Sequence, residues 1–331
     1  MAIFDEEKLY VHKMVDYLNS KKAFPFEIHG FTNKKELSEF SEKQEIEILL
    51  ISETAFNKEV DMSKIRNTII LTEDGNLLKE TPNKCIDKYQ SAEDVIKETM
   101  DYYTNLRDAP GSIFLAKKQP KIIGVYSPVG RSLQTSYSLL LGQFLSRKDK
   151  VIYLNFEPFS GFGRIVKSDG KKDITDLIYF LKNNPEKFIY KLESIVQNVN
   201  GLDYIPPAFS FIDLELIAVA EWKLLLKQIC RGSEYDYIIL DLSDNIQGLF
   251  EILRICDHIY TITKDDGIAL AKIEQYEKML NMTEYTDILN KTKKFRFPLF
   301  RNLPIGIEQL PLSEMAEYVN KIIREDFCGE I

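Results

Sequence analysis

Apolar runs and amphipathic segments alternate along the first third of the chain. Residues 46–51 are almost wholly apolar, which is typical of a central strand buried on both faces of a sheet. Residues 9–18 instead place most of their apolar side chains on one helical face. Similar runs predict strands at residues 2–4, 26–31, 46–51, 68–71 and 85–86. Because helices separate them, with Asn33 and Ser91 as N-caps, residues 1–105 are predicted to form a parallel, doubly wound α/β domain.

A segment with turn-forming residues separates this pattern from a second one. Residues 106–120 contain a Pro-Gly turn and a second proline beside two lysines, so we interpret them as a linker. Further strands are predicted at residues 122–126, 151–154, 202–205, 235–242, 258–262 and 295–299. Helices are predicted at residues 135–148, 174–181, 188–196, 213–229, 268–280 and 313–324. Residues 121–331 are therefore predicted to form a larger, mostly parallel sheet with helices on both faces.

The strand, tight loop and helix at residues 121–148 form the unit from which phosphate-binding loops are built. Backbone N–H groups of such a loop and the N-terminus of its helix present positive charge to an anion. A working loop reads GxxxxGK[ST], with a lysine for the β and γ phosphates and a hydroxyl for Mg²⁺. Here Pro128 and Leu133 stand at the two glycines and Gln134 at the lysine, whereas Thr135 keeps the hydroxyl. The loop has the architecture of a phosphate site but lacks its central charge.

Residues 129–136 resemble the KGGxGKT[ST] loop of the MinD/ParA superfamily of deviant Walker ATPases, and the resemblance covers about residues 121–325. It implies ATP and Mg²⁺ as ligands and a homodimer as the working form. The residues that it places around the nucleotide are Gly130, Arg131, Ser132, Leu133, Gln134, Thr135 and Ser136. It assigns Mg²⁺ to Thr135 and to Asp241, which ends an apolar strand where a Walker B carboxylate belongs.

This sequence departs from the superfamily at charged positions. The signature lysine corresponds to Val129 and the phosphate lysine to Gln134. The aspartates of the second motif, which activate water, correspond to Asn155 and Glu157. Losing a charge-assisted phosphate contact costs about 1.5–3 kcal/mol, and hydrolysis also needs an oriented water. We therefore expect ATP to bind weakly or not at all, turnover to be at most that of a weak ATPase, and no residue to be assigned as catalytic.

Residues 1–105 resemble a response-regulator receiver domain. Asp5-Glu6 match its acidic pair, Thr72 its hydroxyl and Lys88 its lysine. The strand that should end in a phosphoacceptor aspartate leads instead into Ser52-Glu53. Serine cannot form an acyl phosphate, and Glu53 is out of step by one residue, which on a strand means the opposite face. The resemblance implies a pseudo-receiver; that Asp5, Glu6 and Lys88 are simply solvated charges stays open.

A receiver-like domain ahead of a MinD-like domain is the arrangement of the CpaE/TadZ proteins, which are polar localisation factors for Flp-type (tight-adherence) pilus assembly. The resemblance implies a localisation or scaffold protein in which self-association and contacts with pilus-assembly or polar proteins replace catalysis. One alternative is a slow ATP-dependent dimer switch in which Arg131 replaces the P-loop lysine. Another is a signalling adaptor that acts through the pseudo-receiver. A loop that is only an inherited connection and binds nothing also stays open.

Charge and hydropathy restrict the surroundings in which the protein works. The net charge of −8 argues against a nucleic-acid or anionic-membrane surface, because phosphate neutralisation needs clustered Lys and Arg. The N-terminus has no basic region, and no segment reaches the roughly 18 apolar residues of a membrane helix. The last predicted helix is acidic rather than basic. We expect a cytoplasmic protein without stable membrane insertion, held at a pole or at the inner face of the membrane only by partners.

Overall fold

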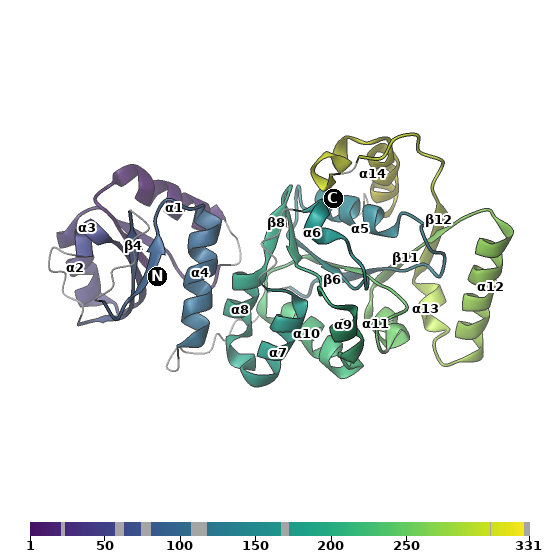
Figure 1. Ribbon diagram of the computed structural model, residues 1–331, viewed down its shortest axis with the longest axis horizontal. Helices are drawn as coiled ribbons and strands as arrows, with labels where there is room; N and C mark the ends of the chain where they lie inside the picture. Colours follow the sequence, from purple (N-terminus) through teal and green to yellow (C-terminus); the bar gives the residue numbers. More distant parts are fainter. Residues whose placement is uncertain are drawn as a thin grey trace. The chain divides into compact units, whose positions relative to one another are not determined.

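The structure is a computed structural model that describes residues 1–20, 24–56, 63–73, 81–106, 118–166, 172–304 and 306–327. The chain divides into two compact units, one of Met1–Ile113 with Ile189–Ser194 and one of Phe114–Phe188 with Ile195–Ile331. Most of the predicted linker, residues 107–117, lies outside the described residues. Both units are drawn in Figure 1, and the expected α/β class with mostly parallel sheets is confirmed.

The first unit is built on a parallel sheet with the strand order β2-β1-β3-β4-β5. Its strands are β1 (Ala2–Phe4), β2 (His29–Phe31), β3 (Ile46–Ser52), β4 (Ile65–Thr72) and β5 (Lys84–Asp87). Its helices are α1 (Lys8–Ser20), α2 (Lys34–Lys43), α3 (Glu53–Phe56) and α4 (Ala92–Asn105). This strand order is the one that flavodoxin-like doubly wound folds share. The predicted caps are confirmed, because Asn33 and Ser91 accept backbone N–H groups at the starts of α2 and α4.

Alternate residues of the strands supply separate cores on the two faces of this sheet. Ile3, Ile48 and Leu50 pack with α1 and α4, whereas neighbouring residues of β1 and β3 pack with α2 and α3. The helix α8 (Phe188–Ile195) contributes Tyr190 to the first of these cores. The Tyr190 ring centroid lies 4.9 Å from that of Tyr103, at the end of α4. A segment distant in sequence therefore completes the first unit.

The second unit contains a sheet with the order β12-β11-β6-β10-β7-β9-β8. Its strands are β6 (Lys121–Val125), β7 (Val151–Asn155), β8 (Gln197–Val199), β9 (Leu202–Ile205), β10 (Tyr237–Asp241), β11 (His258–Thr263) and β12 (Thr292–Arg296). Its helices are α5 (Gln134–Leu145), α6 (Phe162–Ile165), α7 (Ile174–Asn183), α9 (Phe211–Leu216), α10 (Val219–Gly232), α11 (Leu249–Ile255), α12 (Gly267–Met282), α13 (Asp287–Asn290) and α14 (Glu314–Phe327). Figure 1 shows α5 and α14 on one face of the sheet and α10 to α12 on the other. Helices on both faces were predicted, and this is confirmed.

Several predicted elements differ from the observed ones. The helix predicted at 213–229 is two helices, because the backbone is extended at Ile217 and Ala218 between α9 and α10. The Glu221 carboxylate accepts the Ala218 N–H at 2.8 Å and so starts a new helix there. The strand β8 was not predicted; it pairs antiparallel with β9 through a tight turn in which Asn200 and Gly201 have positive φ. The strand predicted at 295–299 lies earlier, as β12, and that at 26–31 is shortened to β2.

Among the described residues, no helix combines the length and apolar character required to cross a membrane.

Candidate functional site

The loop that joins β6 to α5 lies at the carboxyl end of the central strands of the second sheet. The strand β6 pairs with β10 and β11, and β10 also pairs with β7. In this register Asp241, the last residue of β10, is level with Val125 of β6 and with Asn155 of β7. The carboxyl ends of parallel strands are where open α/β sheets bind their ligands. The structure thus brings the loop and the two distant polar positions, Asn155 and Asp241, to one edge.

The loop holds two side-chain-bearing residues in the left-handed backbone region. Arg131 has φ 54° and Leu133 has φ 65°. Leu133 stands at the second glycine of the Walker pattern and Arg131 within the glycine-rich loop. The left-handed conformation costs an L-residue roughly 1–2 kcal/mol. The loop therefore has, at these two positions, a backbone conformation that suits glycine better than the residues it carries.

Replacing Arg131 with glycine is expected to raise the free energy of unfolding by up to about 1 kcal/mol, because the relief of strain exceeds the added chain entropy. Arg164, in the helical backbone of α6, is the matched control: Arg164→Gly is expected to lower stability by about 0.5–1 kcal/mol. Urea unfolding followed by Trp222 fluorescence measures both. Equal destabilisation by the two changes would show that the loop carries no such strain.

Gln134, at the position of the missing lysine, turns into the protein. Its side chain is 9% exposed, and its amide nitrogen donates to Asp241 Oδ1 at 2.6 Å and to the Leu242 carbonyl at 2.8 Å. Both amide N–H groups are therefore used at the end of β10. A side chain held in this way does not reach out from the loop toward a phosphate group.

The carboxylate of Asp241 is completely buried and accepts hydrogen bonds at both oxygens. In addition to Gln134, the Tyr153 hydroxyl donates to Oδ2 at 2.9 Å and the Asn155 amide donates to the same oxygen at 3.1 Å. Asn155 also donates to the Tyr153 hydroxyl at 2.7 Å. Burial raises the pKa of Asp241, and the hydrogen bonds from Gln134, Thr135 and Tyr153 oppose that rise. We call these four residues, Gln134, Tyr153, Asn155 and Asp241, the Asp241 network.

This network fits a magnesium ion poorly. Mg²⁺ requires near-octahedral oxygen ligands and keeps several of its waters. Asp241 has no exposed surface, and neutral donors bond to both of its carboxylate oxygens. The Thr135 hydroxyl also interacts with this carboxylate. A metal here would have to displace bonds that already satisfy the buried carboxylate. The arrangement stabilises the carboxylate without an ion.

Other predicted residues lie apart from the Asp241 network. Val129, at the signature-lysine position, is buried and packs on Ala269 and Ile273 of α12. Gly130 and Arg131 are exposed at the tip of the loop, where Lys264 Nζ lies 3.4 Å from the Gly130 carbonyl oxygen. Ser132 is buried, and Ser136 is half-buried in the first turn of α5. Lys264 and Tyr153 were not predicted from the sequence, since only the fold brings them to the site.

Glu157, two residues beyond β7, has a carboxyl group whose pKa lies near neutral pH. Burial, followed by the nearby Asp241 and Asp244 carboxylates, raises its pKa from 4.5 to about 7. Its carboxylate is not part of the Asp241 network, although its backbone N–H donates to Asn155 Oδ1 at 2.9 Å. The second acidic position therefore carries a carboxyl group that changes charge near physiological pH.

The raised pKa of Glu157 predicts a pH-dependent stability. Glu157 binds its proton more tightly in the folded than in the unfolded chain, so the free energy of unfolding falls as pH rises from 4.5 to about 7. With solvent screening of this half-buried group, we expect a loss of about 1 kcal/mol. Urea unfolding at several pH values measures it, and Glu157→Gln is expected to remove this part of the dependence. An unchanged profile in that variant would assign the effect to other groups.

A second cluster of charges lies in the first unit, around Lys88. The Lys88 side chain is 2% exposed, and its ammonium lies 2.8 Å from Asp5, 3.1 Å from Glu7 and 3.2 Å from Glu73. Burial alone lowers the pKa of Lys88, but the three carboxylates outweigh it and raise the pKa. Sequence reasoning paired Asp5 with Glu6, which lies exposed; Glu7 and Glu73 instead reach the lysine.

The remaining receiver-like positions are near this cluster but make other bonds. Thr72 donates to the Ile86 carbonyl at 3.3 Å. Ser52, fully buried at the end of β3, shares a 3.3 Å hydrogen bond with Thr54. Glu53 is half-buried in the first turn of α3. The cluster is thus a buried ammonium surrounded by carboxylates.

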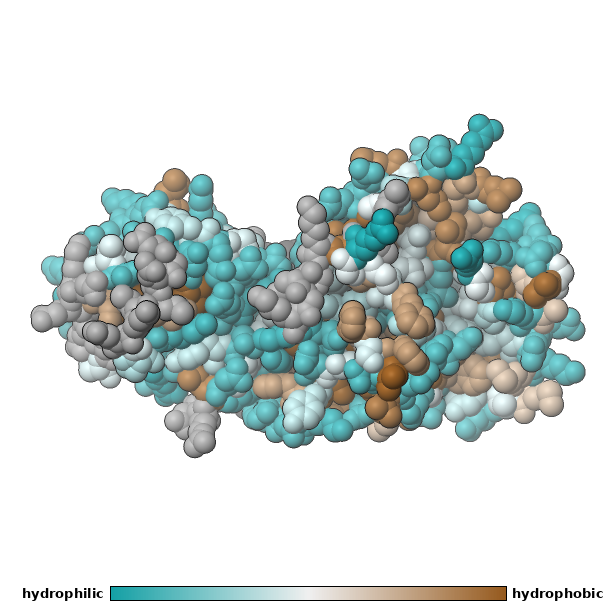
Figure 2. Space-filling model, in the orientation of Figure 1, coloured by the Kyte–Doolittle hydropathy of each residue, from teal (hydrophilic) through white to brown (hydrophobic). Residues whose placement is uncertain are grey.

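Apolar side chains gather on the surface of the second unit around α9. Phe159 is 83% exposed, Phe209 97% and Leu216 72%, and the ring centroids of Phe159 and Phe211 lie 5.6 Å apart. Figure 2 shows brown, hydrophobic residues on the face that α9 occupies in Figure 1. Large exposed apolar patches on protein surfaces mark sites of interaction. We call these residues, with Ile212, the α9 patch.

No protein-family model matches the chain, and no curated protein matches it. Solved structures similar to it include a ParA-family ATPase from Chlorobium tepidum, at 18% identity and a TM-score of 0.46, covering 61% of this chain and 92% of that one. A plasmid partition protein from Borrelia burgdorferi has 17% identity and a TM-score of 0.44, with 65% and 100% covered. The MinC:MinD cell division complex of Aquifex aeolicus has 16% identity and a TM-score of 0.40, with 54% and 69% covered. Because these similarities are weak, function has to be inferred from the chain's own residues.

Proposed function

We propose that this protein is a localisation or scaffold protein of the CpaE/TadZ type, which serves Flp-type pilus assembly and works without ATP turnover. The observation that carries the proposal is the Asp241 network. Gln134 stands where a phosphate-binding lysine belongs and instead completes the hydrogen bonding of the carboxylate that would orient Mg²⁺. The position has changed from a ligand-binding role to a structural one.

The loss of catalysis extends beyond Gln134. Val129 is packed in a small apolar cluster, so its position offers no charge to a second nucleotide. Asn155 cannot act as a general base, and its amide is already bonded to Tyr153 and Asp241. Phosphoryl transfer depends on charge neutralisation and an oriented water. None of these three positions supplies either function.

Binding to other proteins remains as the role of the second unit. The α9 patch presents large apolar side chains on the surface of the second unit. An exposed apolar surface of this kind favours self-association, or contact with pilus-assembly proteins or with proteins located at the cell pole. The first unit acts as a pseudo-receiver in this proposal. Its strand order and the Lys88 cluster support that assignment, and the buried serine at the acceptor position argues against phosphotransfer.

A second candidate, a slow ATP-dependent dimer switch, is favoured by the two cations at the loop. Arg131 is exposed at its tip, and Lys264 reaches the Gly130 carbonyl oxygen from the end of β11. Together they could neutralise phosphate charge that Gln134 leaves uncompensated. This candidate predicts that ATP binding depends on Arg131 and Lys264.

The two candidates are distinguished by calorimetry with ATP and Mg²⁺, phosphate release, and light scattering. The scaffold role predicts no turnover above background and an oligomeric state that is unchanged by nucleotide. ATP-dependent dimerisation that is lost in both Arg131→Ala and Lys264→Ala would establish the switch instead. Lys118→Ala is the matched control, because Lys118 precedes the amino end of β6, whereas the loop follows its carboxyl end, and it pairs with Asp236.

A further inference from the structure

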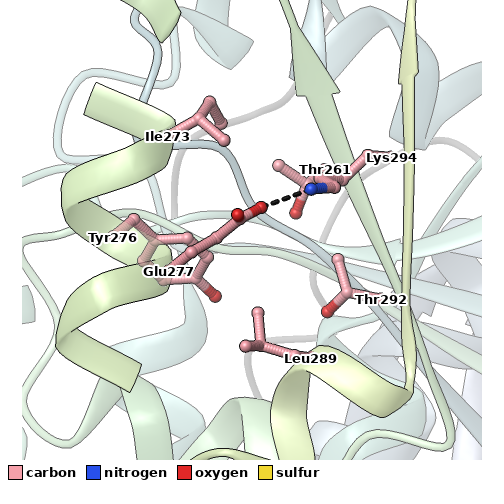
Figure 3. A pocket seen from close by; sticks show the side chains of 7 residues that line it. All are labelled: Thr261, Ile273, Tyr276, Glu277, Leu289, Thr292 and Lys294. Atoms are coloured by element: carbon pink, nitrogen blue, oxygen red, sulfur yellow. Dashed lines mark hydrogen bonds and ion pairs between the residues drawn. The ribbon is translucent and has the colours of Figure 1, made fainter. Parts of the chain in front are cut away.

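A small cavity of about 150 Å³ lies between the sheet and α12 in the second unit. Strands β11 and β12 supply Thr261, Thr292 and Lys294, and α12 supplies Ile273, Tyr276 and Glu277. Leu289 of α13 closes the lower end in the view of Figure 3. None of these residues belongs to the Asp241 network or to the α9 patch.

The cavity follows from the residues at this helix–sheet contact. Thr261 is paired with Lys294 across β11 and β12, and Thr292 lies two residues earlier on β12, so the three share one face of the sheet. On α12, Ile273, Tyr276 and Glu277 are spaced to lie on one helical face. Such contacts are usually filled by interlocking apolar side chains. Here short hydroxyl side chains and an ion pair leave space between the layers.

Two hydroxyl groups in this cavity lack a partner. Thr261 is 1% and Tyr276 4% exposed, and neither side-chain oxygen has a hydrogen bond to any residue that the structure describes. Figure 3 shows both side chains, one from the sheet and one from the helix, bordering the same space. Buried polar groups in folded proteins are usually satisfied. Two unsatisfied hydroxyls around one cavity therefore indicate a guest that bonds to both.

The two charged side chains at the cavity are paired with each other. Glu277 and Lys294 form an ion pair across it (Figure 3), and their side chains are 30% and 49% exposed. Because the two opposite charges neutralise each other, the pair offers no net charge that would hold an anion or a cation. A neutral group with hydroxyls can instead donate to Glu277 and Thr292, and either donate to or accept from Thr261 and Tyr276.

We propose that this cavity binds a small neutral polyhydroxyl molecule with about six non-hydrogen atoms, the size of guest that a cavity of this volume holds. Its hydroxyls bond to Thr261 and Tyr276, and its C–H groups contact Ile273 and Leu289. The ion pair of Glu277 and Lys294 stays formed at the mouth. This site is independent of the scaffold role and does not require ATP.

The test uses glycerol as the probe, with the full chain and methyl-resolved NMR of Ile273 and Leu289. Saturable shifts of both methyl signals are expected for the wild type. Thr261→Val and Tyr276→Phe keep the shape of the side chains and are each expected to weaken binding about tenfold. Tyr10→Phe is the matched control, because the Tyr10 hydroxyl is also buried without a partner among the described residues but lies in the first unit.

Three results would overturn the proposal. If the methyl shifts changed linearly with glycerol concentration, without saturation and equally in all variants, glycerol would act only as a solvent and water alone would fill the cavity. If the shifts saturated with a charged probe (alanine, acetate or methylammonium) but not with glycerol, the site would bind charged rather than neutral molecules. Equal weakening in Tyr10→Phe would show that the two cavity hydroxyls do not contact the guest.

Discussion

Replacing Asp241 with alanine is expected to lower the free energy of unfolding of the second unit by about 3–5 kcal/mol. The change removes the acceptor for Gln134, Tyr153 and Asn155. Gln134 would keep its bond to the Leu242 carbonyl and Asn155 its bond to Tyr153, but the buried N–H and O–H groups that now donate to Asp241 would lose that acceptor. The loss is expected with or without nucleotide, because the carboxylate acts here as a structural acceptor. The lone tryptophan, Trp222, is fully buried in this unit, so its fluorescence during urea unfolding measures the effect.

Asp244→Ala is the matched control for this prediction. Asp244 follows the same strand and accepts a short hydrogen bond from the Tyr126 hydroxyl, but it is exposed. Water can replace it, so we expect a loss of about 1 kcal/mol. If Asp241→Ala cost no more than this control, or if ATP and Mg²⁺ protected the wild type but not the variant, Asp241 would have kept a metal-binding role.

In the first unit, Lys88→Met is expected to lower stability by a similar amount, about 3–5 kcal/mol. The substitution leaves the Asp5 carboxylate, 3% exposed, without its nearest counter-ion. Glu7 and Glu73 are 53% and 37% exposed and can turn to water, so the penalty falls on Asp5. Hydrogen exchange of the β3 amides, at the centre of this sheet, measures the change locally.

Two further variants test the reason for this effect. Lys97→Met breaks a surface pair with Glu93 in the same unit and is expected to cost no more than about 0.5 kcal/mol. The double change Asp5→Leu with Lys88→Met is expected to recover most of the loss, because it removes both buried charges. If the double variant stayed as unstable as Lys88→Met, packing around the lysine stem rather than the orphaned Asp5 charge would be responsible.

The α/β class could be predicted because it depends on local periodicity. The apolar residues of β3, the caps at Asn33 and Ser91, and the strand that ends at Asp241 are visible without a structure. The break between α9 and α10 was missed, since every residue from 213 to 229 is compatible with a helix. The extended backbone at Ile217 and Ala218 and the bond from Ala218 N–H to Glu221 show that a second helix starts there. The register between strands and the directions of the side chains could not be predicted from local periodicity.

The sequence by itself determined that residues 121–148 form a strand, loop and helix, and that the charged residues of a phosphate site are replaced there. Only the tertiary structure decided what the replacements do. The pairing of β6, β7 and β10 places Gln134, Tyr153 and Asn155 around one buried carboxylate. In the first unit, Glu7 rather than Glu6 contacts Lys88. The physical reason is that apolar periodicity acts over neighbouring residues, whereas hydrogen bonds join groups that sequence places far apart.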